Sequence, residues 1–200
     1  MPLRVNPNRM ELLRLRKRLV LARRGHKLLE DKLEGLIQRF LQESKDYRAF
    51  RDEVEAQFLS FLALGTYART RIREDSWHLI SETSNGRTTL RERVEKRMNI
   101  PVNVLSVEEI SLPVYSLVET PTVLDELVKR WRELLEKIVE LANKERYLIA
   151  LAMEIERTKR RVNALEYKLI PQLEETIKFI SSKLEELERS NFFRLLRLKE

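Results

Sequence analysis

Apolar side chains recur at alternating steps of three and four residues along the first third of the chain. From Leu12 to Phe61 this repeat covers fifteen positions, and only His26, Glu43 and Gln57 among them are polar. An average step of 3.5 residues is the spacing at which two helices wrap around each other in a coiled coil. The pattern therefore predicts one long amphipathic helix that needs an apolar partner along its length.

A second apolar stripe occupies the last third of the chain. Before Pro171 it consists of Leu127, Trp131, Leu134, Ile138, Leu141, Leu148, Ala152, Ile155 and Val162, and after it of Leu173, Ile177, Ile180, Leu184 and Leu187. We expect the two stripes to pair antiparallel within one chain, which brings Leu12 near the C-terminal end of the second helix. Pro171 should kink this helix locally, because its ring excludes the backbone hydrogen bond to residue 167.

The middle of the chain carries different signals. Thr83–Gly86 breaks the helical pattern. Thr89–Glu92 fits a capping box and predicts a short helix, and residues 99–118 are strand-like and predict a β-hairpin. The expected hairpin tip comprises Val107, Glu108, Glu109 and Ile110. Neither glutamate readily takes the left-handed conformation of a tight turn, so we expect a looser one.

These patterns predict three segments. Asn6-Pro7-Asn8 marks a helix start, because Asn is a good N-cap and Pro bars a helix upstream. We expect an N-terminal long helix over residues 1–82, a middle insert over 83–120 and a C-terminal long helix over 121–200. The predicted fold class is all-α, with a long antiparallel two-helix coiled coil formed by the terminal segments and a small middle insert that contains a short helix and a β-hairpin.

Positive charge gathers at both ends of the chain. The formal net charge is +7, and the terminal basic residues include Arg14, Arg16, Arg18, Arg194 and Arg197. An antiparallel hairpin brings the two clusters to the same end. Such charge favours nucleic acid, lipid headgroups or an acidic protein surface as the partner. Nucleic acid is disfavoured, because few aromatic residues are interleaved for base stacking.

The sequence offers little for catalysis. It has no cysteine, and its four glycines form no phosphate-binding loop. His26 lies in the first stripe beside Gly25, where a polar layer within a helix pair is the favoured interpretation and a functional histidine would need a carboxylate or metal partner. We therefore expect no catalytic residue, no metal site and no cofactor. The longest uncharged run, Ala56–Ala68, has 13 residues, against the roughly 20 that a membrane span requires, so we expect no direct membrane insertion.

One stretch of the second helix carries a family resemblance. It consists of Arg160, Arg161, Val162, Asn163, Ala164, Leu165 and Glu166. With Ile170-Pro171 behind it, and with Arg9-Met10 and Gly25-His26 near the front of the chain, this motif resembles the D subunit of V-type and archaeal A-type ATPases. Glu109 departs from the family pattern, which usually has glycine in the hairpin.

The resemblance implies the function of a central rotor shaft. Such a protein transmits torque between an ion-driven membrane ring and the catalytic hexamer, in a complex for ATP synthesis and hydrogen-ion or other ion transport. The implied partners are the hexamer of A and B subunits, the small F subunit of the stalk, and the C subunit on the membrane rotor ring, with no nucleic acid. The chain itself would be non-catalytic and cytoplasmic, held at the inner face of the cell membrane through the complex.

The same resemblance gives the basic ends a role. The paired termini would insert into the hexamer, with Arg14, Arg16, Arg18, Arg194 and Arg197 as its contacts. The alternative is a cytoplasmic basic coiled-coil adaptor or a nucleic-acid-associated rod. The Arg160–Glu166 motif together with the hairpin favours the rotor shaft, since a generic rod needs neither.

Overall fold

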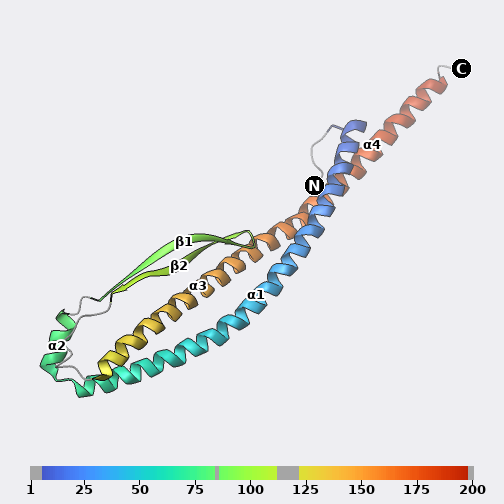
Figure 1. Ribbon diagram of the computed structural model, residues 1–200. Coiled ribbons are helices and arrows are strands. Elements are labelled where there is room, and N and C mark those ends of the chain that lie inside the picture. The colour runs from blue at the N-terminus through green and yellow to red at the C-terminus, as the bar shows by residue number, and fades with distance from the viewer. Residues whose placement is uncertain (1–5, 84–85, 112–121, 198–200) are drawn as a thin grey trace. The chain divides into compact units, whose positions relative to one another are not determined.

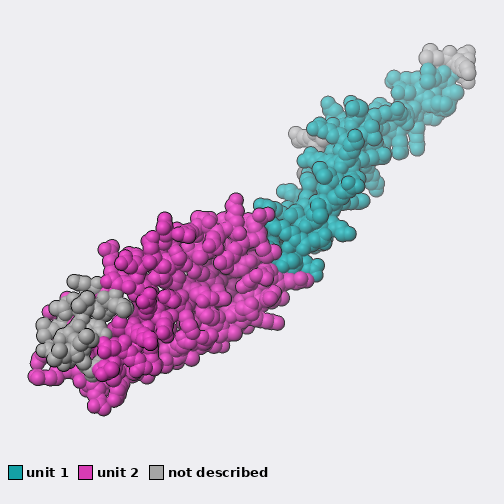
Figure 2. All heavy atoms as spheres, in the orientation of Figure 1, with its two compact units in different colours: residues 1–37, 155–200 teal, residues 38–154 magenta. Residues whose placement is uncertain are grey.

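The computed structural model describes residues 6–83, 86–111 and 122–197. Its elements are the helices α1 (Arg9–Arg71), α2 (Glu74–Thr83), α3 (Thr122–Ala164) and α4 (Ile170–Arg197), the strands β1 (Arg87–Arg97) and β2 (Ile100–Ser111), and a short π-helix, η1 (Leu165–Leu169) (Figure 1). The chain divides into two compact units, which are described separately below. Unit 1 is Met1–Ile37 with Ile155–Glu200, and unit 2 is Gln38–Glu154 (Figure 2).

Helix α1 begins where the sequence predicts it. The Asn8 side chain accepts a hydrogen bond from the Met10 amide at 3.1 Å, and the Asn8 carbonyl accepts one from the Leu12 amide at 3.0 Å. Asn8 is therefore the N-cap, and its side chain satisfies one of the backbone donors that the first turn leaves without a partner.

Unit 1 is a pair of antiparallel helices with a narrow apolar core. Leu15 and Ala22 of α1 pack with Leu173 and Ile180 of α4, and further apolar residues flank them. These flanking residues are Leu12, Leu19, Leu169, Ile170, Ile177 and Leu184. Cross-helix ion pairs join Arg9 to Glu188 and, at 2.6 Å, Arg23 to Glu174. The expected position of Leu12 near the C-terminal end of the second helix is confirmed.

In unit 2, α1 and α3 again run antiparallel. The rings of Phe61 and Trp131 contact each other at a tilt of 36° with their centroids 5.5 Å apart, and the Lys137 ammonium lies 2.7 Å from the Glu53 carboxylate. Helix α2 follows α1, and the Arg69 guanidinium covers the Trp77 ring of α2 at 5.0 Å. The predicted fold class, a long antiparallel two-helix coiled coil with a small middle insert, is confirmed.

Burial along the helices tests the two stripes position by position. All fifteen positions of the first stripe are buried or half-buried. The second stripe needs corrections at Leu187 and Ala152, which are both exposed. Leu151, the neighbour of Ala152, is fully buried, and Thr158 joins the buried face. Alternating steps of three and four residues from position 148 lead to 151, 155, 158 and 162, all of which are buried or half-buried. The predicted period is therefore confirmed, and Leu151 takes the stripe position that was assigned to Ala152.

The hairpin lies elsewhere than predicted. Strand β1 occupies the region expected to hold a short helix, and it pairs antiparallel with β2 from Arg97↔Ile100 to Arg87↔Ser111. The tip is Met98-Asn99, whose φ angles of 51° and 63° are both positive, as the tight type I′ turn requires. The predicted looser tip is therefore wrong. Most of the predicted second strand, residues 112–118, lies outside the described residues.

The residues expected at the tip lie inside strand β2. They are Val107, Glu108, Glu109 and Ile110. The register shifts between Thr89 and Leu90, which face Glu109 and Val107, so Glu108 has no residue opposite it and forms a β-bulge. Long-range pairing thus outweighs the local capping pattern, because strand preference depends mainly on the cross-strand neighbours and on burial.

Candidate functional site

The end of unit 1 that holds the start of α1 and the end of α4 exposes both apolar and basic side chains. We call it the terminal end. Because Arg9 pairs with Glu188, α4 continues past the first residue of α1 as far as Arg197 (Figure 1). The apolar residues on this extension are 47–65% exposed, and they are Phe192, Phe193, Leu195 and Leu196. The rings of Phe192 and Phe193 contact each other with centroids 6.5 Å apart. We call residues 189–197 the α4 tip.

The five predicted contact arginines are all exposed and all belong to unit 1. Only Arg14 of these makes an ion pair within the described chain, a long one of 3.7 Å to Glu11. At about 1.5 Å of rise per residue, Arg14 lies about 8 Å and Arg194 about 9 Å from the Arg9–Glu188 pair, in opposite directions along the helices. The positive charge is therefore spread along the terminal end of the unit.

The family-like motif straddles the start of the π-helix. Val162 is buried and Leu165 half-buried, whereas the other motif residues are exposed, namely Arg160, Arg161, Asn163, Ala164 and Glu166. The Ile170 amide donates to the Leu165 carbonyl, the i→i+5 bond of a π-turn. One wide turn of π-helix therefore stands just before Pro171, the residue at which the sequence predicts a local kink.

His26 lies against this wide turn. Its side chain is 16% exposed, with Nδ1 3.3 Å from the Glu30 carboxylate and Nε2 3.9 Å from that of Glu166. Nε2 is buried and has no hydrogen-bond partner among the described residues. The histidine occupies the half-buried stripe position that the sequence predicts, and the two carboxylates are the partners that sequence reasoning did not identify.

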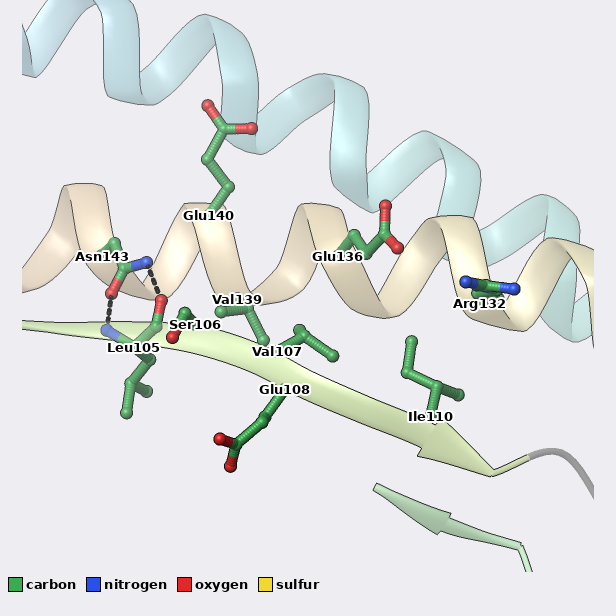
Figure 3. A pocket seen from close by; sticks show the side chains of 10 residues that line it. All are labelled: Leu105, Ser106, Val107, Glu108, Ile110, Arg132, Glu136, Val139, Glu140 and Asn143. Carbon is green, nitrogen blue, oxygen red and sulfur yellow. Dashed lines mark hydrogen bonds between the residues drawn. The ribbon is translucent and has the colours of Figure 1, made fainter. Parts of the chain in front are cut away.

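In unit 2 the hairpin is fastened along α3. The Asn143 side-chain amide donates to the Leu105 carbonyl and accepts from the Leu105 amide, both at 2.7 Å (Figure 3). The Arg146 guanidinium donates to Glu92 at 3.0 Å and to the Asn103 carbonyl at 3.5 Å. Asn143 therefore pairs with the edge of β2 as a neighbouring strand would.

The surface of unit 2 is hollowed beside α3. One hollow, of about 410 Å³, lies between β2 and α3, and its lining includes Val107 and Ile110 of β2 and Arg132 and Glu136 of α3 (Figure 3). Another, of about 380 Å³, is mainly apolar and lies between α1, α2 and α3. Its lining includes Phe61, Leu62, Gly65, Trp77, Leu124 and Leu127. Among the residues that the structure describes, no cluster of three His, Asp or Glu side chains could hold a metal ion, and no helix is long and apolar enough to cross a membrane.

Comparison with known families identifies the chain's relatives. The family model for the D subunit of ATP synthase matches residues 11–200. The chain belongs to the ATP synthase D subunit family. The resemblance inferred from the Arg160–Glu166 motif is therefore confirmed.

Relatives in this family align along nearly the whole chain. The V-type ATP synthase D subunit from Thermoanaerobacter sp. (strain X514) is 42% identical over 202 residues, covering 98% of this chain and 95% of the relative. The proteins of the same name from Acetivibrio thermocellus and Clostridium botulinum (strain ATCC 19397 / Type A) are each 40% identical, covering 99% and 100% of this chain and 91% and 95% of the relatives. Such coverage includes both units and the hairpin.

The family motif and the basic ends are visible in the sequence, but the sequence analysis assigned no partner contact to the apolar side chains of the α4 tip. The signal was available in Phe192-Phe193 and Leu195-Leu196, since a strongly apolar run at a helix end had no assigned partner. Contact of these surfaces with other subunits belongs to the proposal below.

Proposed function

We propose that the chain is the central-stalk rotor shaft of a V-type ATPase or ATP synthase and transmits torque between the ion-driven membrane ring and the A/B hexamer. The observation that supports this most directly is the antiparallel helix pair of unit 1, with its exposed basic and apolar end, in a chain of the D subunit family. The chain itself is non-catalytic in this proposal, and nucleotide chemistry belongs to the hexamer.

The proposed contact with the hexamer is through the terminal end of unit 1. Exposed ion pairs contribute only about 0–1 kcal/mol each and weaken with salt, so Arg14, Arg16 and Arg18 can exchange acidic partners as the shaft turns. Arg194 and Arg197 do the same on the α4 tip. Apolar burial has no preferred direction, so the phenylalanines of the tip can remain in contact with an apolar ring at every rotary angle.

Unit 2 is proposed to face the other stalk partners, the small F subunit and the C subunit of the membrane ring. Its apolar hollow beside Trp77 supports this, because an exposed apolar patch rimmed by polar residues is typical of a protein contact. Through these partners the chain is held at the cytoplasmic, inner face of the cell membrane.

Neutralising the arginines tests the proposal. We expect Arg14→Gln with Arg16→Gln and Arg18→Gln, and separately Arg194→Gln with Arg197→Gln, to weaken assembly with the hexamer or the coupling of ATP hydrolysis to rotation. The measurements are subunit co-purification and ATPase activity of the reconstituted complex, with helical circular dichroism to confirm folding.

The matched control neutralises Lys45, Arg48 and Lys129, which are exposed residues of unit 2. It removes the same charge as the triple arginine variant and should leave assembly with the hexamer intact. Unchanged assembly and coupling in the arginine variants, together with salt-sensitive DNA binding that these variants lose, would favour the nucleic-acid-associated alternative.

A further inference from the structure

Strand β1 has an outer edge to which no described residue is hydrogen-bonded through its backbone. The sheet contains β1 and β2 only, and the backbone hydrogen bonds of the described chain outside its helices and strands lie at Asn8 and Arg73. All of β1 is exposed except Thr89, which is half-buried. The strand is 11 residues long, and long open edges of this kind are templates for pairing with another strand.

The contacts of β2 identify which residues of β1 face outward. Leu105 uses both its amide and its carbonyl for Asn143 on the side away from β1, so Leu105 and its partner Glu92 form a pair without ladder hydrogen bonds. Hydrogen-bonded and non-hydrogen-bonded pairs alternate along the ladder, so Lys96, four residues after Glu92, should also belong to a pair without ladder hydrogen bonds. Its partner is Pro101, which has no amide hydrogen to donate and therefore fits this assignment. By this alternation, four residues of β1 direct their backbone N–H and C=O groups away from β2, namely Leu90, Glu92, Val94 and Lys96.

The charge on this edge selects the kind of strand that can pair with it. Strand β1 contains five basic and two acidic residues. Arg91 pairs with Glu108 and Arg97 with Glu95, whereas three basic residues have no ion-pair partner in the described chain, namely Arg87, Arg93 and Lys96. A second copy of β1 would bring like charges together and is disfavoured, but an acidic strand would be attracted.

Apolar side chains stand on the same edge. The Leu90 side chain is 50% exposed and that of Val94 is 68% exposed, and the two lie four residues apart, on the same face of the hairpin. A neighbouring strand would cover them with its own side chains, since diagonal and directly opposite residues on one face lie within contact distance. The edge thus offers main-chain hydrogen bonds, apolar contacts and positive charge together.

We infer that the outer edge of β1 docks an extended, acidic segment of another subunit of the complex, which adds a third strand to the hairpin. This inference rests on the proposed function, because the partner is taken from the rotary complex. Recognition is by strand addition, in which the backbone supplies the binding energy and alternate side chains supply the specificity. Asn143 and Arg146 occupy the β2 edge, which leaves β1 as the edge for docking.

Amide hydrogen exchange at single-residue resolution tests the inference. The full chain is measured alone and after assembly with recombinant A, B, F and C subunits. We expect the hydrogen-exchange rates of the outward amides of β1 to fall by roughly tenfold on assembly, because each would then donate a hydrogen bond to the added strand. The inward amides, such as those of Arg91 and Arg93, already bond within the ladder and should change much less.

The outcomes separate the inference from the proposed function. If the complex assembles and the outward amides keep their rates, the edge is not a docking site. If outward and inward amides slow equally, the hairpin is buried without strand pairing. If single-stranded DNA protects the outward amides and the subunits do not, the protein partner is wrong. Failure of the chain to assemble at all would contradict the proposed function and the inference with it, whereas unchanged rates in an assembled complex overturn the inference alone.

A pair of variants adds a second measurement. Val94→Pro removes one outward amide without removing a ladder donor, and Val94→Thr keeps that amide on a β-branched residue. We expect Val94→Pro, but not Val94→Thr, to lose the protection gained on assembly at Glu92 and Lys96. Retention of protection in Val94→Pro would contradict the inference.

Charge variants provide an independent test that does not depend on whether Val94→Pro disrupts the pairing of β1 with β2 in the isolated chain. Arg93→Glu with Lys96→Glu repels an acidic strand and should lose the same protection. The matched control, Arg48→Glu with Lys129→Glu, changes the net charge equally at exposed positions on the helices and should keep it. Equal protection in the two double variants would contradict an acidic partner on this edge.

Discussion

At the scale of single residues, two threonines interrupt the apolar stripe of unit 1. Thr158 and Thr176 are both fully buried. The Thr176 hydroxyl donates to the Gln172 carbonyl at 2.6 Å, which keeps it satisfied inside the helix. The Thr158 hydroxyl has no hydrogen-bond partner among the described residues. The two positions look alike in sequence, yet their free-energy contributions should differ.

We expect Thr158→Val to stabilise the protein by about 1 kcal/mol, because valine has the same shape and removes a buried hydroxyl without a partner. Thr176→Val is the matched control and should destabilise by about 0.5–1.5 kcal/mol, since it removes a hydrogen bond. Urea unfolding followed by circular dichroism measures both. A Thr158→Val variant that is less stable than the wild type would show that the hydroxyl is satisfied.

The turn residue Asn99 provides a second prediction at this scale. Its φ of 63° is tolerated by asparagine and glycine but costs a β-branched residue about 1–2 kcal/mol. We therefore expect Asn99→Val to weaken the hairpin and Asn99→Gly to preserve it. Amide exchange of Arg93 and Glu95 within the ladder reports the difference, and equal exchange in the two variants would rule out the left-handed turn.

At the scale of elements, the helices were more predictable than the strands. The first stripe was readable because fifteen positions share one period, so a single exception such as Glu43 changes little. The hairpin depends on the pairing of β1 with β2 and on a Met98-Asn99 turn, and Met is not a typical turn residue. The local capping pattern at Thr89 therefore suggested a helix that pairing overrides.

Surface detail was also beyond the sequence. Charge at the two ends could be predicted from Arg14 and Arg194, but the bond between Asn143 and Leu105 joins residues 38 apart in sequence. Its partner becomes visible only once β2 lies along α3. The same holds for Glu166 beside His26, which depends on the register of α1 against η1.

The α1–α3 pair of unit 2 has a pH-sensitive link. A hydrogen bond from Lys137, assisted by its charge, lowers the pKa of Glu53 below its ordinary value. A carboxyl whose folded pKa is depressed adds stability above its unfolded pKa and loses it as the pH falls through the folded pKa. We expect Lys137→Met to lower the urea midpoint at about pH 7 and to make little difference at about pH 3. An equal loss at both pH values would show that packing, not the ion pair, carries the effect.

At the scale of the whole molecule, the chain belongs to a family of ATP synthase subunits, and its formal net charge is +7. Each unit pairs its helices antiparallel and offers its own surfaces, namely the α4 tip and arginines on unit 1 and the hairpin edge and apolar hollow on unit 2. The proposed rotor shaft needs partners on both units, and we propose these surfaces as the contacts.

Rotation of single complexes tests torque transmission most directly. The chain has no cysteine, so Lys129→Cys on the exposed start of α3 provides one site for attaching a bead. The A/B hexamer is fixed to a surface, the labelled chain is assembled with it, and the bead is followed while ATP is supplied. We expect continuous rotation in one direction that stops when ATP is removed. A bead that stays still or only fluctuates, while the same complexes hydrolyse ATP, would contradict the function of a rotor shaft.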